Sequence, residues 1–424
     1  MTLDSHTGGN RPADPGVPAP LSHAAEIHTG DTVMLNEPAR QPSITRPATH
    51  TARVPIGLVL VLVLGAAAAS CAGAPEGEAE AEPAVGGNQA LIVIQEQGGR
   101  PFGGTVMGDP GTGSIRCDHG YVEWQIPENP RSVPLLMIHA SSTKTWDTTF
   151  DGREGFRTIF LRRGFPVYMT DLPRTGRAGQ GCAPTSYTPR PDNDQRSLTS
   201  WRIGTWLPGD PAPDYYPGVQ FGVNDPEVMD EFYRIQYPEF NSPENEQVET
   251  DALSVLLDEI GSSVLLTHSS TGIRGWVTGI KSPNVGGIVS YEPGATVLPE
   301  NEMPPPIRRA DGMMLPAGRP VPMEDFMKLT QIPVQIIWGD YIPTELDETN
   351  VGPRLTLDGR RINVLRAQLM ADAINRHGGN ATNVMLPADL DINGNTHFPM
   401  SDLNNVEIAD LLSEFLTDNG LDAR

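Results

Sequence analysis

Short apolar runs alternate with amphipathic stretches along the chain from residue 90 to the C-terminus. The run at 133–140 is typical of a strand buried on both faces of a sheet, and 152–164 follows it with helical spacing and a terminal glycine. Further strands are predicted at 90–95, 121–127, 165–171, 262–268, 286–292, 332–340 and 382–387, and further helices at 272–282, 361–377 and 405–417. The first two strands are expected to pair antiparallel. Strands that alternate with helices predict an α/β fold with a mostly parallel, doubly wound sheet.

Two long segments interrupt this alternation. Residues 183–249 are rich in Pro, Trp and Tyr and contain only short helical stretches, near 226–235 and 244–258, while 293–327 are rich in Pro and Met. Loops of this length inside a compact domain are usually functional, so we expect an inserted lid at about 183–249. Its aromatic side chains either line an apolar acyl pocket or pack within the lid; they are Trp201, Trp206, Tyr215 and Tyr216.

The N-terminal region contains one strongly apolar run, at 54–69. Its helical length would be about 24 Å, which is shorter than a bilayer crossing requires. Arginines precede the run and small residues follow it, as in a secretory signal peptide. The Ala-Ala-Ser-Cys ending resembles a bacterial lipobox, in which Cys71 would become the lipidated first residue. Ordinary signal cleavage beside an incidental cysteine is the alternative, and translation would start at either Met1 or Met34.

These features predict three regions along the chain. Residues 1–70 form an N-terminal extension and signal peptide, 71–88 form a disordered acidic linker, and 89–424 form the folded domain. The protein is therefore expected to leave a bacterial cytoplasm as a periplasmic or cell-surface lipoprotein, or otherwise to be extracellular. Contact with a membrane is expected only through a lipid anchor at Cys71.

Charge and motif content limit the classes of partner. The chain has 30 basic and 53 acidic residues, a net charge of −23, which disfavours binding to nucleic acid or to an anionic membrane surface. The sequence contains no HExxH or CxxC motif and no dinucleotide or P-loop fingerprint, so neither a metal nor a cofactor is predicted. Nothing in the pattern indicates an oligomeric state.

The cysteine count has a consequence in an exported protein. If Cys71 is lipidated, Cys117 and Cys182 remain as an even pair in an oxidising compartment. The sequence therefore leaves two possibilities open: these two cysteines form a disulfide, or both remain free thiols.

Candidate chemistry begins at Ser269. This serine follows a predicted buried strand and precedes a glycine-containing helix, which is the setting of a nucleophile elbow. The usual G-x-S-x-G spelling is degraded, because Thr267 and Thr271 occupy the glycine positions. The alternative is a serine-rich helix cap, since serine and threonine are preferred there.

A nucleophilic serine needs a base, and His397 is the best-placed histidine. It lies in a loop after the last predicted strand, which should reach the carboxyl edge of the sheet. The other histidines fit less well: His268 adjoins the serine and should face the core, His139 ends a strand, and His377 ends a helix.

The acid that would orient this base has two candidates at strand ends. Glu292 ends the predicted strand at 286–292, and Asp340 ends the one at 332–340. Both would project from neighbouring positions of the sheet towards the same loop. The later strand end is the commoner location in folds of this type, so the bare pattern slightly favours Asp340.

Several blocks together resemble a small group of secreted bacterial α/β-hydrolase esterases. The blocks are residues 139–156, 160–171, 267–272, 289–294 and 394–412, and the similarity extends over roughly 90–420. That group has a Ser–Glu–His triad with the glutamate after the strand that follows the elbow. The resemblance implies Ser269 as nucleophile, Glu292 as acid and His397 as base, with Asp340 in a structural role.

In an α/β-hydrolase fold the oxyanion hole is built from two backbone N–H groups. One should come from Ser270, after the nucleophile, and the other from Ala140 or Ser141. The family has glycine after the histidine of this loop, whereas this sequence has alanine, which resists a positive φ.

These observations predict a serine hydrolase that cleaves a carboxylic ester, from a small molecule or a polymer, through an acyl-enzyme intermediate. A lactonase or a hydrolase of polymer-derived esters or diketones would use the same residues. The degraded elbow motivates a different alternative, a non-catalytic binding lipoprotein on a hydrolase scaffold.

Overall fold

The computed structural model of the protein describes residues 91–139, 144–183, 194–234 and 242–424. These residues belong to one compact unit, Ala84–Arg424. The predictions for 1–70 and 71–88, including the lipidation of Cys71, lie outside the described residues. Among the helices that are described, none is both long enough and apolar enough to cross a bilayer.

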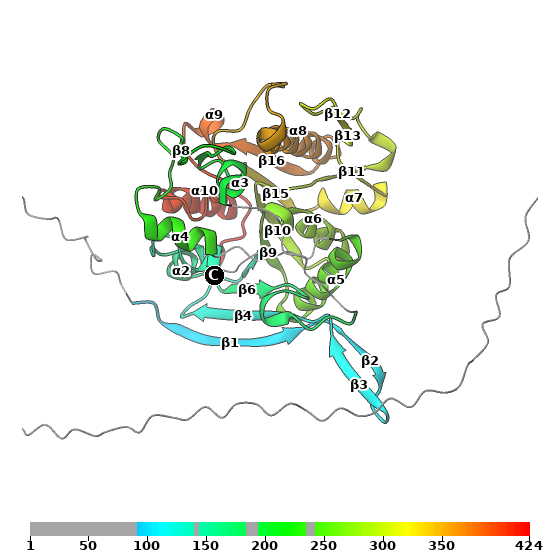
Figure 1. Ribbon diagram of the computed structural model, residues 1–424. Coiled ribbons are helices and arrows are strands. Elements are labelled where there is room, and N and C mark those ends of the chain that lie inside the picture. Colours follow the sequence, from blue (N-terminus) through cyan, green and yellow to red (C-terminus); the bar gives the residue numbers. More distant parts are fainter. Residues whose placement is uncertain (1–90, 140–143, 184–193, 235–241) are drawn as a thin grey trace, which may run out of the picture. The chain divides into compact units, whose positions relative to one another are not determined.

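An eight-stranded sheet forms the centre of the fold, in the order β1-β4-β6-β5-β9-β10-β15-β16 (Figure 1). The strands span Ile94–Phe102 (β1), Gly120–Pro127 (β4), Leu135–Ile138 (β5), Val167–Asp171 (β6), Ser263–His268 (β9), Val285–Tyr291 (β10), Pro333–Trp338 (β15) and Asn380–Met385 (β16). Strand β4 is antiparallel to both of its neighbours, and every other pair is parallel. The mostly parallel, doubly wound sheet predicted from the sequence is therefore confirmed.

Helices cover both faces of this sheet. They span Lys144–Asp147 (α1), Phe156–Arg162 (α2), Asp194–Ser200 (α3), Pro226–Arg234 (α4), Pro243–Ile260 (α5), Gly272–Lys281 (α6), Met323–Leu329 (α7), Leu355–Arg376 (α8), Leu386–Leu390 (α9) and Asn405–Asp418 (α10). Helices α2 and α10 lie on the opposite side of the sheet from α5 and α6 (Figure 1). Along β5 the side chains alternate between the two cores, with Leu135 and Met137 on the α2/α10 side and Leu136 and Ile138 on the α5/α6 side. All four are fully buried, as expected for a strand covered on both faces.

The first strand differs from its prediction. It spans Ile94–Phe102 and not 90–95, so it includes the polar and glycine-rich sequence that a hydrophobic pattern overlooks. Aromatic side chains of β4 explain the glycines: a Cβ on Gly98 would lie 2.4 Å from the Trp124 ring, and one on Gly99 would lie 2.3 Å from the Tyr121 hydroxyl. Packing against β4 therefore determines the position of this strand more than its own hydrophobicity does.

The segment between β6 and α5 contains α3, α4 and the short strands β7 (Gly204–Thr205) and β8 (Asp214–Tyr215). Helix α5 begins at Pro243, inside the range expected for the lid, yet it packs against β1, β4 and α6 as part of the central fold. Trp201, Trp206 and Tyr215 are partly buried against the core on the α2/α10 side.

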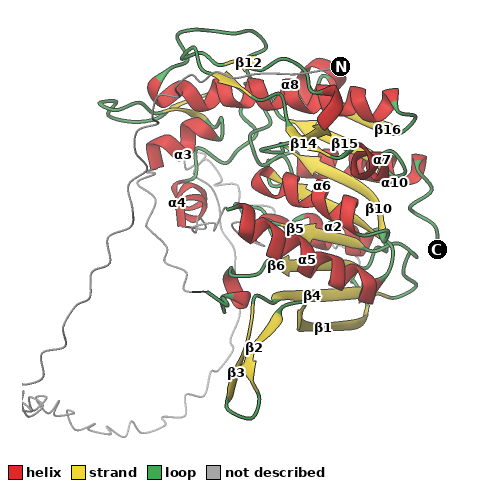
Figure 2. Ribbon diagram, turned by 90° about the vertical axis from the view of Figure 1, so that its right-hand side faces the viewer, coloured by secondary structure: helices red, strands yellow, loops and turns green. Residues whose placement is uncertain are grey.

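Smaller elements lie outside the central sheet. Strands β2 (Thr105–Asp109) and β3 (Gly113–Cys117) form a hairpin that projects away from it (Figure 2). A disulfide between Cys117 and Cys182 ties the base of this hairpin to the segment after β6. The Pro/Met-rich stretch contains the short strands β11 (Val297–Pro299), β12 (Ile307–Arg308), β13 (Met314–Leu315) and β14 (Arg319–Val321).

Candidate active site

Ser269 stands at a sharp turn directly after β9. Its φ of +55° is in the left-handed region, which is uncommon for a residue other than glycine and marks a constrained turn. A single 3-10 turn, Ser269–Thr271, leads from this residue into α6. The local geometry is that of a nucleophile elbow at the carboxyl edge of the sheet.

The two threonines in the glycine positions of the elbow each have a structural reason. Thr271 Oγ1 accepts a hydrogen bond from the backbone N–H of His268 at 2.9 Å and lies 3.1 Å from the carbonyl oxygen of Ile138. Thr267 donates to Ser290 Oγ at 2.8 Å. The close approach of helix to strand comes from Gly275 instead, where a Cβ would lie 2.9 Å from Thr267 Cγ2. The departure from the G-x-S-x-G consensus therefore does not disrupt the turn.

A chain of hydrogen bonds joins Ser269, His397 and Glu292. Ser269 Oγ lies 2.9 Å from His397 Nε2, and His397 Nδ1 lies 2.6 Å from Glu292 Oε2. Because a carboxylate only accepts, the imidazole proton lies on Nδ1, which leaves Nε2 to accept from the serine hydroxyl. The Glu292 and His397 side chains are 0% and 1% exposed, so water does not compete for these bonds.

Glu292 reaches this position from the turn after β10, where its φ is +51°. Its Oε1 accepts from the backbone N–H of Gly339 at 2.8 Å. Arg202 binds both carboxylate oxygens, through Nη1 to Oε2 at 2.8 Å and through Nη2 to Oε1. Arg202 is fully buried and also donates from Nε to the carbonyl oxygen of Asp340.

Asp340, the other acid considered from the sequence, accepts hydrogen bonds from other groups. Its Oδ1 accepts from the backbone N–H of Tyr341 at 2.6 Å, and its Oδ2 accepts from that of Gly394 at 2.8 Å. Its own N–H donates to the carbonyl oxygen of Asn395 at 2.7 Å. Asp340 therefore ties the end of β15 to the loop that carries the histidine, whereas Glu292 is the carboxylate in contact with His397.

The loop that carries His397 is held by a buried carboxylate that sequence reasoning missed. Asp402 accepts from the backbone N–H and from Oγ1 of Thr396, both at 2.7 Å, and from Asn395 Nδ2 at 3.1 Å. The backbone N–H of His397 donates to the carbonyl oxygen of Trp201 at 3.0 Å. The one sequence feature that could have indicated this hydrogen-bond network is the high content of acid and amide residues in the loop.

Buried charges set the protonation states of the triad. Burial alone would raise the pKa of Glu292, but the positive charge of Arg202 and the hydrogen bonds from Arg202 and His397 hold it well below its usual range. Burial and the charge of Arg360 lower the pKa of His397 to about 3, against the opposing effect of Glu292. Around neutral pH Glu292 is thus ionised and His397 is neutral.

Two more histidines are linked by hydrogen bonds to the backbone of His397. His139 Nε2 lies 2.8 Å from His268 Nδ1, and His268 Nε2 lies 2.6 Å from the carbonyl oxygen of His397. A carbonyl only accepts, so His268 donates from Nε2 and receives the His139 proton on Nδ1. The pair joins the ends of β5 and β9 to the histidine loop, and the sequence identified its members only as less suitable bases.

The residues proposed for the oxyanion hole are only partly described. Ser270 is the second residue of the 3-10 turn that begins at Ser269, and the backbone carbonyl of Ser269 accepts from the backbone N–H of Gly294 at 2.8 Å. Ala140 and Ser141 lie outside the described residues, so their place as the second donor stays a prediction.

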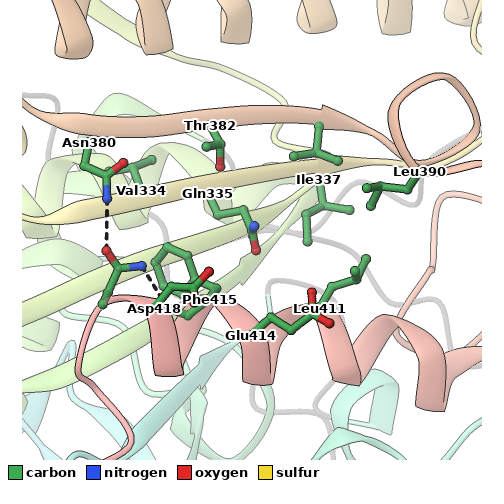
Figure 3. A pocket seen from close by; sticks show the side chains of 12 residues that line it. Val334, Gln335, Ile337, Asn380, Thr382, Leu390, Leu411, Glu414, Phe415 and Asp418 are labelled. Carbon is green, nitrogen blue, oxygen red and sulfur yellow. Dashed lines mark hydrogen bonds between the residues drawn. The ribbon is translucent and has the colours of Figure 1, made fainter.

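Other potential sites are separate from the triad. A pocket of about 280 Å³ lies between strands β15 and β16 and helix α10 (Figure 3). Its lining side chains include Gln335, Thr382 and Glu414 and contain no member of the triad. Within the described part of the chain, no group of three or more His, Cys, Asp or Glu residues could hold a metal ion.

The central sheet, the elbow and the order serine, acid, histidine along the chain define an α/β-hydrolase fold. A solved structure of a novel bacterial esterase superposes with a TM-score of 0.60 and 27% identity, and the match covers 78% of this chain and 98% of that one. Over 182 residues the chain is 38% identical to a "Probable secreted lipase phiG" of Fungal sp. (strain ATCC 74256). That match covers 41% of this chain and 48% of the lipase, so it spans about half of that relative. No protein-family model matches the chain.

Proposed function

We propose that the protein is a carboxylic ester hydrolase that forms an acyl-enzyme on Ser269. The observation that carries this proposal is the position of His397, which lies within hydrogen-bonding distance of both Ser269 Oγ and Glu292 Oε2. The descriptions of the two similar proteins, a lipase and an esterase, support the same class of reaction.

The proposed reaction follows from the protonation states of the site. His397 Nε2 takes the Ser269 proton while Oγ attacks the ester carbonyl carbon, and the imidazolium then protonates the departing alcohol. In the second half His397 takes a proton from water as the water attacks the acyl carbon, and the imidazolium returns that proton to Ser269 Oγ when the bond from Oγ to the acyl group breaks and the carboxylic acid leaves. Glu292 holds the tautomer and stabilises the imidazolium, and the backbone N–H of Ser270 is proposed as one donor to the oxyanion.

Export is part of the proposal. The Cys117–Cys182 disulfide is of the kind that persists in oxidising compartments, and one similar protein is described as secreted. We propose that the protein is exported from a bacterium and anchored through Cys71.

Hydrolysis of a chain-length series of p-nitrophenyl esters tests the function. We expect the wild-type protein to release p-nitrophenolate and Ser269→Ala to lose that activity. Ser254→Ala is a matched control, because Ser254 lies on α5 and donates only to the carbonyl oxygen of Thr250. Equal rates for wild type and Ser269→Ala, or no turnover of any ester, would contradict the proposal and favour a binding lipoprotein.

A further inference from the structure

The turn that carries Glu292 also lies against the nucleophile elbow. We call residues 292–295, which follow β10 directly, the acid turn. Its first residue binds His397 through the carboxylate, and its other three residues contact the elbow and helix α6. One short segment of the chain therefore reaches both the base and the backbone of the nucleophile.

Close packing joins the acid turn to helix α6. A Cβ added to Gly272, the first residue of this helix, would lie 2.4 Å from the Cβ of Pro293, so only glycine allows this approach. Trp276, about one turn further along the same helix, is fully buried and donates from Nε1 to the carbonyl oxygen of Ala295 at 3.0 Å. The acid turn is therefore fixed to the start of the helix that follows the nucleophile.

The acid turn also binds the backbone of the nucleophile itself. The backbone N–H of Gly294 donates to the carbonyl oxygen of Ser269 at 2.8 Å. The backbone N–H of Gly272 donates to the same oxygen from within the elbow. A carbonyl oxygen has two lone pairs, so these two donors occupy both of its acceptor positions. Together they fix the direction of the Ser269 carbonyl, and one of them comes from a different segment of the chain.

The direction of this carbonyl determines that of the neighbouring N–H. In a planar trans peptide, the N–H of Ser270 points opposite to the C=O of Ser269. Ser270 is the second residue of the helical stretch that begins at Ser269, where backbone N–H groups have no acceptor within the helix. This N–H is therefore directed away from Gly272 and Gly294, at the end of the helix where an anion can bind.

We propose that Gly294 is a positioning residue for the oxyanion hole: its N–H holds the Ser269 carbonyl and thereby aims the N–H of Ser270 at the oxyanion. This inference rests on the proposed esterase function and adds to it a second role for the acid turn. The same four residues then align the base, through Glu292, and the oxyanion donor, through Gly294. A donor held in the direction of the developing charge stabilises the transition state more than one that must reorient.

A pair of substrates tests the inference through the oxyanion itself. The pair is the p-nitrophenyl ester that wild type hydrolyses fastest and its thionoester, in which sulfur replaces the carbonyl oxygen. Sulfur is a weak hydrogen-bond acceptor, so N–H donors stabilise the charge that develops on oxygen more than that on sulfur. The quantity measured is the ratio of kcat/KM for the ester to that for the thionoester, after subtraction of the uncatalysed rates. A loss of folded protein or of the base lowers both rates alike and leaves this ratio unchanged.

Gly294→Pro removes the N–H, and we expect the ratio to fall at least about tenfold, since loss of a whole oxyanion donor costs about 10²–10³ in kcat. Gly294→Ala is the matched variant that keeps the N–H. Its added Cβ would lie 3.6 Å from the Ser269 carbonyl oxygen, an ordinary contact, so its ratio should equal that of wild type. Glu292→Gln should lower both rates and leave the ratio unchanged, because it acts on the base.

A second variant removes the N–H without a proline ring. Glycolic acid incorporated at position 294 replaces the N–H by an ester oxygen and changes no side chain, so it serves where circular dichroism shows that Gly294→Pro is not folded. The same fall in the ratio is expected. An unchanged ratio in either folded variant, or a fall in Gly294→Ala as large as that in Gly294→Pro, would overturn the inference. Failure of wild type to hydrolyse any p-nitrophenyl ester would instead refute the esterase function, and the inference with it.

Discussion

At the scale of single residues, the proposed mechanism depends on the carboxylate of Glu292. It is fully buried, yet it stays ionised because Arg202 and the Gly339 N–H solvate it in place of water. Arg202 was not identified from the sequence, because nothing in a lid sequence marks an arginine that turns inward to bind a glutamate. The bare pattern also leaned slightly towards Asp340, since spacing cannot show which of two strand-end acids faces a loop.

Exchange of each acid for its amide separates their roles. Glu292→Gln should lower kcat by several orders of magnitude, on the scale of ~10⁴, because an amide neither fixes the imidazole tautomer nor stabilises its cation. Asp340→Asn removes an acceptor of two backbone bonds and should have the smaller effect. Measurement of kcat on one p-nitrophenyl ester gives the comparison, and a larger loss in Asp340→Asn would show that the acid was assigned wrongly.

The low pKa of His397 predicts how the activity depends on pH. Catalysis needs the neutral imidazole, which is lost only when pH falls through the pKa of about 3. An ordinary histidine would lose it near 6.5. Initial values of kcat/KM should therefore stay level between pH 7 and pH 5, with the fold monitored by circular dichroism. A decline with an apparent pKa near 6.5 in protein that remains folded would contradict this environment.

At the scale of the element, most of the fold was predictable from the sequence, because buried strands such as β5 are apolar along their whole length. The errors fall where packing overrides that signal. Strand β1, for example, contains glycines that accommodate the rings of β4, which a hydrophobic pattern overlooks. At the elbow, Thr271 replaces glycine because its hydroxyl holds the turn, a contact that no consensus spelling contains.

Two glycine-to-alanine changes test the contact between helix α6 and strand β9. A Cβ at Gly275 would lie 2.9 Å from Thr267 Cγ2, so Gly275→Ala should lower the free energy of unfolding by about 1–3 kcal/mol. Gly359, within α8, faces open space, and Gly359→Ala should raise it by about 0.5–1 kcal/mol because alanine is the better helix former. Urea unfolding of both variants gives the values; equal effects would show that the packing is not tight at Gly275.

At the scale of the whole molecule, a compact α/β-hydrolase domain follows an N-terminal region whose role was inferred from the sequence alone. The disulfide and the apolar run at 54–69 are both typical of an exported protein. If the proposed lipid is attached at Cys71, it would be the means of membrane attachment, since the net charge of −23 opposes binding to anionic headgroups.

Detergent partitioning tests this anchor. The full chain expressed in a bacterial host should partition with the membrane fraction, and Cys71→Ala should release it, because one sulfur carries the lipid. Intact mass of the released and retained forms gives an independent readout. Partitioning that does not change in Cys71→Ala would contradict the anchor and leave the catalytic proposal unaffected.

The central claim is that Ser269 is the nucleophile, and covalent labelling by a fluorophosphonate tests it most directly. The reagent reacts with a serine only where a base removes its proton, so it reports the Ser269–His397 pair without any choice of substrate. We predict one adduct per chain, mapped to Ser269 by peptide mass spectrometry and absent in Ser269→Ala. An unlabelled wild-type protein, or an adduct that persists in Ser269→Ala, would contradict the account.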